Sequence, residues 1–250
     1  MKVRSTLFLL IPLLFAGCET TRVADPEPAD PEFADLLRRG ATAAAQGAYG
    51  NASRFYGRAM DRAMVIDRPR EIAIAALCRC PFALNDGDAA DAERCLSVIR
   101  TLDLDEDFQL RIADFELRKR WLAGEPEEPA LRNLEEAVAK MTAPPSITCD
   151  ARLTLLEAKL RTGKRVDHAE IPTLEAVKDP PGGLVNRQLA LRAWATRDAD
   201  AWLEAIRRYA RAGNIPAALR EAKRCSEVLN SEAAARLGKQ IAEGAHVKEP

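Results

Sequence analysis

Helix-period segments separated by recurring glycines constrain this chain more than any other feature of its sequence. From residue 31 onward, apolar residues recur at helical spacing, and no segment shows the alternation typical of a strand. The helical runs stop at five glycines, separated by 37 to 50 residues, a spacing that suits helical repeat proteins: Gly47, Gly87, Gly124, Gly163 and Gly213. The sequence therefore predicts an all-α protein.

Two segments carry the clearest repeat pattern. In the segment 46–60, Gly47 is expected to end one helix in the left-handed conformation, and Ala52, Tyr56 and Ala59 follow on one face of the next helix. The segment 202–229 has a similar order of Trp, Tyr, Gly, Ala and Cys. Small residues are expected where paired helices approach closely, because larger side chains would overpack the contact.

These residues resemble the tetratricopeptide repeat (TPR), a helix–turn–helix unit. The resemblance is clear for 36–64 and 202–229, moderate for 73–100 and weak for 110–178. It implies a right-handed α-solenoid over residues 32–244, which binds partners along a concave surface. Another α-solenoid or a closed bundle remains an alternative.

Local signals refine this prediction. Asp88 and Asn214 are expected to be helix N-caps. Pro81 falls inside the first helix of the second unit and is expected to kink it. The longest interval between glycines leaves room for an additional helix near 184–196, after the breaker Asp179–Gly183.

The N-terminus has the layout of a secretory signal, with Lys2 and Arg4 before the apolar run 7–17. That run is too short to span a bilayer, which needs about 20 apolar residues. Its end, "FAGC", resembles the lipobox of bacterial lipoproteins, which implies that 1–17 is removed and that Cys18 is acylated. The alternative is a soluble secreted protein.

The resemblance to lipoproteins also implies a location. Glu19 after the cysteine favours the outer membrane, with the protein facing the periplasm of a bacterial envelope. Residues 18–31 are rich in proline and acid and are expected to form a disordered tether, and 245–250 a flexible tail.

Composition and motif content argue against several classes of function. The formal net charge is −1, which disfavours a nucleic-acid binder. Only His168 and His246 are present, and no triad, phosphate loop or zinc motif can be assembled. The segment 103–108, "DLDEDF", lacks the glycine of a calcium loop and is expected to start a helix. We therefore expect no enzyme activity, no cofactor and no metal.

Cysteines offer one possible covalent link. An exported protein can form disulfides, and a bridge from Cys78 or Cys80 to Cys95 would join the two helices of the second unit. Cys225 is expected to be a buried thiol.

The resemblance to TPR proteins implies a non-enzymatic scaffold that binds envelope peptides or proteins. The alternative is an accessory subunit or regulator of a cell-wall enzyme or of a secretion or assembly machine. The sequence leaves the oligomeric state open. Carrying the groove pattern of that family onto this chain gives these candidate partner-binding residues: Arg111, Arg118, Glu157, Arg161, Arg207 and Arg211.

Overall fold

The computed structural model describes residues 30–104, 106–141 and 145–245. Within these ranges every regular element is helical, with eleven α-helices, one short 3₁₀ helix and no strand. The prediction of an all-α protein is confirmed. The predicted signal peptide, the acylated Cys18, residues 18–29 of the tether and His246 lie outside the described residues.

The helices follow one another through mostly short connections, which places each against its neighbours in sequence. In chain order they are α1 (Pro31–Ala45), α2 (Tyr49–Val65), α3 (Pro69–Asp86), α4 (Ala89–Arg100), α5 (Glu106–Ala123), α6 (Glu128–Lys140), α7 (Pro145–Arg161), η1 (His168–Glu170), α8 (Gly182–Thr196), α9 (Ala199–Arg211), α10 (Ile215–Leu229) and α11 (Glu232–Gly244).

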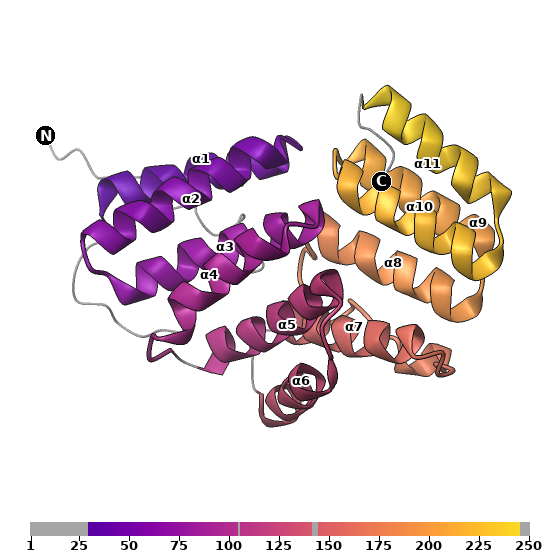
Figure 1. Ribbon diagram of the computed structural model, residues 1–250, viewed down its shortest axis with the longest axis horizontal. Helices are drawn as coiled ribbons and strands as arrows, with labels where there is room; N and C mark the ends of the chain where they lie inside the picture. Colours follow the sequence, from indigo (N-terminus) through magenta and orange to yellow (C-terminus); the bar gives the residue numbers. More distant parts are fainter. Residues whose placement is uncertain (1–29, 105, 142–144, 246–250) are drawn as a thin grey trace, which may run out of the picture.

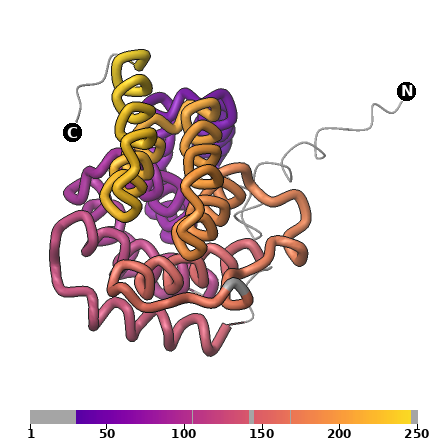
Figure 2. The backbone as a smooth tube through the Cα atoms, turned by 90° about the vertical axis from the view of Figure 1, so that its right-hand side faces the viewer, coloured from indigo at the N-terminus to yellow at the C-terminus, as the bar shows by residue number. Residues whose placement is uncertain are grey.

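The chain curls back on itself (Figure 1). Helices α1–α4 form one arm, α8–α11 form a second arm, and α5–α7 connect the two below. The view turned by 90° shows the same arrangement, with α5–α7 lying beneath both arms (Figure 2). Helix α10 of the second arm contacts α3 of the first. The two arms are therefore brought together, although most contacts are between neighbours in sequence.

Helix ends form where the sequence predicts them. All five glycines that separate the helical runs have a positive φ, from +65° at Gly124 to +76° at Gly87 and Gly213. Glycine is favoured there because a Cβ is strained in this conformation. Asp88 and Asn214 accept hydrogen bonds from backbone N–H groups three residues later, at 2.8 and 3.2 Å. Both predicted N-caps are confirmed.

The apolar core consists of three adjoining clusters. The first fills the arm of α1–α4 and reaches α5, the second lies among α5, α6 and α7, and the third fills the arm of α8–α11 and reaches α7. Helix α5 thus contributes Phe115 to the first cluster and Leu117 to the second. Because α5 and α7 are buried on two sides, neither has the single apolar stripe of a surface helix.

The segment after Gly163 departs from the predicted repeat. Residues 162–181 contain only η1 as regular structure, where a repeat would have its second helix. Pro172, Pro180 and Pro181 disfavour a helix in the second half of this segment, because proline removes a helical N–H donor. The additional helix expected near 184–196 is confirmed as α8. Pro81 lies inside α3, which continues for a further turn to Asp86.

In the described part of the chain, the two arms approach each other at the following groups, which we call the closure contact. The Tyr49 hydroxyl donates to the carbonyl oxygen of Ala212 at 3.1 Å. The backbones of Gly47 and Gly213 approach closely, so that a Cβ on either would lie 3.1 Å from a carbonyl oxygen of the other turn. Arg220 of α10 donates to the backbone oxygen of Asn85, near the end of α3, at 3.0 Å.

Candidate functional site: an arginine-lined cavity

A cavity of about 290 Å³ lies where the two arms face α5 and α7. Its walls come from α3, α5, α7, α8 and α10, with Tyr209 of α9. These are the helices that turn toward the inside of the curled chain. The cavity is therefore assembled from segments far apart in the sequence.

Charged side chains dominate the polar part of the lining. Arginines outnumber carboxylates, so the wall carries a formal excess of positive charge. The arginines are Arg111, Arg118, Arg161, Arg187, Arg220 and Arg224, and the carboxylates are Asp114, Asp150, Glu157 and Glu221.

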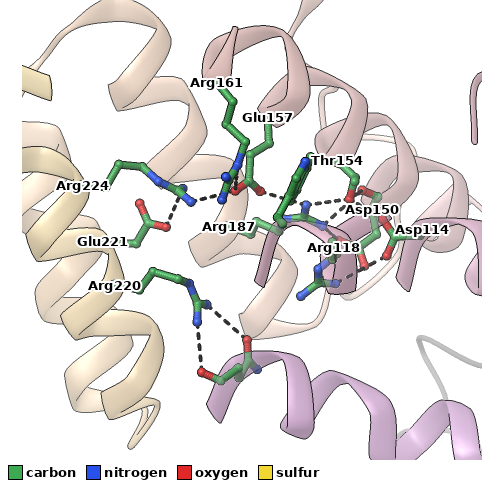
Figure 3. A network of polar contacts seen from close by, with 12 residues as sticks. Asp114, Arg118, Asp150, Thr154, Glu157, Arg161, Arg187, Arg220, Glu221 and Arg224 are labelled. Atoms are coloured by element: carbon green, nitrogen blue, oxygen red, sulfur yellow. Dashed lines mark hydrogen bonds and ion pairs between the residues drawn. The ribbon is translucent and has the colours of Figure 1, made fainter. Parts of the chain in front are cut away.

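Arg187 of α8 is the centre of a network of polar contacts (Figure 3). Its Nη1 donates to Oδ1 of Asp150 at 2.6 Å, and its Nη2 donates to the Thr154 hydroxyl at 2.6 Å and to Glu157 at 3.2 Å. The three acceptors stand on one face of α7, at steps of four and three residues. The arginine side chain is only 13% exposed. One buried guanidinium thus joins α8 to α7.

Arg224 extends the same network to α10. It donates to Glu157 at 2.8 Å and to Glu221 at 2.9 Å, and its guanidinium lies 4.7 Å from the centroid of the Trp194 ring. The second carboxylate oxygen of Glu221 accepts from Nε1 of the fully buried Trp202 at 3.0 Å. Glu157 is consequently held by arginines from two helices, α8 and α10.

These contacts fix the ionisation of the central groups. Burial by itself would raise the pKa of Glu157, but Arg224 and Arg187 outweigh it and hold that pKa far below its usual range. Burial would likewise lower the pKa of Arg187, yet Asp150 and Glu157 raise it above its usual value. The network is ionised and internally paired.

Asp114 of α5 behaves differently. Burial raises its pKa, and the nearby charge of Arg118 offsets this only in part. The Thr154 hydroxyl donates to one carboxylate oxygen of Asp114, and Arg118 Nη1 lies 3.4 Å from the other. Asp114 is therefore the carboxylate of the cavity whose charge is least well compensated.

Three arginines of the lining are less well paired with carboxylates of the described residues than Arg187 and Arg224 are. Arg111 makes no hydrogen bond or ion pair with the described residues, although its charge helps to lower the pKa of Asp150, after the larger effect of Arg187. Arg118 has only the 3.4 Å contact with Asp114. Arg220 donates to the backbone and side-chain oxygens of Asn85, at 3.0 and 3.4 Å, and to no carboxylate of the described chain. Donors of these three guanidinium groups remain available to an anion in the cavity.

The structure brings together four of the six predicted groove residues. Arg111, Arg118, Glu157 and Arg161 all line the cavity, although Glu157 is engaged by neighbouring arginines. Arg161 lies 3.5 Å from Glu157 and stacks over the ring of Trp121, 4.4 Å from its centroid.

Arg207 and Arg211 lie elsewhere. Both are exposed on α9, outside the cavity lining. Arg211 is within 3.3 Å of the carboxylate of Glu204 on the same helix. A role for this pair in partner binding stays a prediction.

Sequence reasoning missed Arg187, Arg220 and Arg224 as members of the site. A usable signal was present in α10, where Arg220 and Arg224 stand among Ala217, Ala218 and Ala222. Charged residues bordering a face of small buried residues suggest a polar interior contact, since isolated charges are rarely buried. No comparable pattern marks Arg187, because it stands near larger residues such as Leu184 and Leu191 on α8.

The predicted disulfide is not present in the structure. None of the five cysteines in the described part of the chain forms a disulfide. Cys80 and Cys95 are fully buried in the apolar core of the first arm. Burial raises the pKa of both thiols, that of Cys95 to about 11, so neither resembles a reactive cysteine.

The structure also bears on the segment 103–108, on metal binding and on membrane spans. Glu106 and Asp107 of the segment 103–108 lie in the first turn of α5, which begins at Glu106, so the predicted helix start is confirmed. Across the described ranges no cluster of three or more His, Cys, Asp or Glu side chains could hold a metal ion. No helix in these ranges is long and apolar enough to cross a membrane.

Comparison with known proteins finds no relative of this chain. No protein family model, no curated protein and no solved structure matches the chain.

Proposed function

We propose that this protein is a non-enzymatic scaffold of the bacterial envelope, anchored by lipid at Cys18, that binds an acidic segment of an envelope peptide or protein. In this proposal the helices form a TPR-like right-handed solenoid, and the cavity is the inner part of its concave surface. The lipobox-like sequence before Cys18 supports the anchor, and Glu19 supports the outer membrane.

One observation carries the binding function: the cavity wall holds six arginines and four carboxylates. Arginines that are incompletely paired with carboxylates favour an anionic occupant, because an uncompensated charge is costly away from water. The paired half of the network, around Arg187 and Arg224, holds the helices in place. The half formed by Arg111, Arg118 and Arg220 is left for the partner.

The test is photo-crosslinking in native membranes from two exposed apolar positions. Leu122 lines the cavity, whereas Val65 ends α2 and is 79% exposed outside that lining. A photoreactive residue at 122 is expected to capture an envelope partner that the same residue at 65 does not capture. Capture at 122 should be lost when Arg111 and Arg118 are changed to Gln. Equal capture from both positions, or capture indifferent to these arginines, would contradict the proposal.

The anchor is tested separately. Cells supplied with labelled palmitate are expected to label the wild-type chain and not a Cys18→Ser variant, and the wild type should fractionate with outer membranes. A wild-type chain that takes up no label would remove the anchor from the proposal and leave the cavity untouched.

A further inference from the structure

The two arms are held at the closure contact by hydrogen bonds and by close approach of two turns. The Tyr49 hydroxyl donates to the carbonyl oxygen of Ala212 at 3.1 Å in a solvent-exposed hydrogen bond. Arg220 reaches across from α10, as Figure 3 shows, and donates to the backbone oxygen of Asn85 at 3.0 Å. None of the three apolar clusters of the described chain includes residues from both arms. Breaking the closure contact therefore does not pull any of these clusters apart.

Each arm is packed against one helix of the connecting region. Phe115 of α5 belongs to the first cluster with α1–α4, and Leu156 of α7 belongs to the third cluster with α8–α11. We therefore divide the described chain into a first half, α1–α5, and a second half, α7–α11. Leu117 of α5 and Ile147 of α7 are both in the second cluster, the smallest of the three. A small contact between packed helices is a suitable place for a hinge.

The buried ion pairs around Arg187 also stay within one half. Arg187 of α8 and Arg224 of α10 both contact Glu157 of α7, at 3.2 and 2.8 Å. Their other carboxylate partners, Asp150 and Glu221, belong to the same half. Separating buried charges is costly, and this cost is avoided when the second half moves as one body.

Closure brings two like charges toward each other. Arg118 of the first half and Arg220 of the second half both line the cavity. Burial lowers the pKa of Arg220, and Glu221 and Glu157 oppose this lowering. The charges of Arg224 and Arg118 add to it. Because like charges repel each other, separation of the halves would relieve the repulsion between Arg118 and Arg220.

We propose that the closure contact is a latch, and that the two halves swing apart about the second cluster and open the cavity between α3 and α10. Release breaks the hydrogen bonds of Tyr49 and Arg220 and separates the turns of Gly47 and Gly213. Because α3 and α10 both line the cavity, their separation widens the way into it. The latch goes beyond the proposed function, since it controls access to the cavity whatever molecule enters.

The hydrogen bonds of the latch set the scale of the closing equilibrium. One typical hydrogen bond shifts an equilibrium by about two- to thirteenfold, and one from a charged donor by more. The minor state of a protein with two conformations is populated at roughly 0.1–10%. We expect the open state of the wild type in this range, and removal of a latch donor should raise it.

The experiment measures distances between pairs of spin labels on the full chain in detergent. The labels are attached at encoded residues other than cysteine, because the described chain contains five free cysteines. One pair replaces Asn51 and Lys223, which are exposed on α2 of the first half and on α10 of the second half. The control pair replaces Arg152 and Lys223, which are both exposed in the second half.

The pair at Asn51 and Lys223 is expected to show one main distance and a minor longer one. Tyr49→Phe removes only the hydroxyl and should raise the ratio of open to closed molecules about two- to thirteenfold. Adding Arg220→Met should raise this ratio further. Tyr209→Phe is the matched control, because the buried Tyr209 makes no hydrogen bond across the closure contact of the described chain, and it should leave the ratio unchanged. The control pair of labels should keep one distance in every variant.

A second measurement follows the exposure of the cavity. Ala190 of α8 is only 3% exposed and lines the cavity, so the thiol of Ala190→Cys should react slowly with a bulky maleimide. Its rate should follow the open population, rising at least about twofold with Tyr49→Phe and more when Arg220→Met is added. Cys225 is fully buried in the third cluster. Its rate reports general unfolding and should not change.

Three results would overturn the latch. They are a single Asn51–Lys223 distance that no variant changes, an equal broadening of the control pair, or a reaction at Ala190→Cys that does not follow the open population. The proposed function fails separately. A chain that opens but captures no envelope partner would keep the latch and lose the scaffold. A chain that captures a partner while its arms never separate would keep the scaffold and lose the latch.

Discussion

Gly47 and Gly213 face each other across the junction between the two arms of the molecule. A Cβ on Gly213 would lie 3.1 Å from the carbonyl oxygen of Gly47 and 3.2 Å from its Cα. Next to them, the Tyr49 hydroxyl donates to the Ala212 carbonyl, 163 positions further along the chain. The same two glycines also end helices, so each has a local role and a long-range role.

This double role can be separated by comparing Gly213→Ala with Gly87→Ala. Both glycines have φ +76°, but a Cβ on Gly87 would meet no atom within 4 Å. Gly87→Ala should cost about 1–2 kcal/mol from the left-handed backbone alone. Gly213→Ala should cost about 1 kcal/mol or more beyond that, because the opposite turn must move. Urea unfolding measures both, and equal losses would argue against a tight closure contact in solution.

Arg187 should be the arginine whose loss harms the fold most. Arg187→Ala leaves Asp150 and Glu157 with fewer partners in a buried site, and we expect a loss of about 3–5 kcal/mol in the free energy of unfolding. The control is Arg208→Ala on α9, where an exposed side chain lies 3.4 Å from Glu204. That variant should change stability by less than about 1 kcal/mol. Similar losses in both variants would mean that the buried network adds nothing specific.

The acid sensitivity of the fold should depend on Glu157. Its pKa is far below the unfolded value of about 4.3, because Arg224 and Arg187 outweigh the effect of burial. The unfolded state therefore binds the proton first as the pH falls. The stabilisation is complete above about pH 5 and is lost progressively below about pH 4.3. The free energy of unfolding, measured from pH 3 to pH 7, should fall less steeply with decreasing pH in Glu157→Gln than in the wild type. An equally steep fall in both would refute this.

The pH dependence of the stability that Asp114 contributes should have the opposite sign to that of Glu157. Burial raises its pKa in the folded state, so the folded state holds the proton more tightly than the unfolded chain does. The ionised carboxylate then costs stability as the pH rises past the unfolded value of about 3.9. Asp114→Asn should compare more favourably with the wild type at pH 7 than at pH 3. A stability difference independent of pH would contradict the raised pKa.

The buried thiols should be protected from alkylation. Cys80, Cys95 and Cys225 are fully buried, and Cys78 is only partly buried. Iodoacetamide applied to the native protein should therefore modify Cys78 first and the three buried thiols only after unfolding. Peptide mass spectrometry without reduction should find no link from Cys78 or Cys80 to Cys95. A linked peptide would restore the disulfide that the sequence suggested.

Much of the helical pattern could be predicted from residues that act locally. A glycine ends a helix through its own φ, and Asp88 or Asn214 caps a helix through a bond three residues away. Such signals need no knowledge of the rest of the chain. The prediction weakened over 110–178 for a physical reason: α5 and α7 are buried on two sides, so their apolar residues do not gather on one face.

The site was predicted only in part. Arg111, Arg118, Glu157 and Arg161 could be placed on inward helix faces by resemblance to a repeat. Their partners could not be identified, because an ion pair such as Arg224 with Glu157 joins residues 67 positions apart. Nothing in either local sequence specifies the other.

The sequence by itself determined where the helices begin and end, since caps, glycines and prolines act on their own backbone. It also determined that the chain would be all-α. Only the tertiary structure decided that α10 returns to α3, which arginines are neutralised, and which are left facing the cavity. Those outcomes depend on the distances between side chains from different helices, and such distances exist only once the helices have packed.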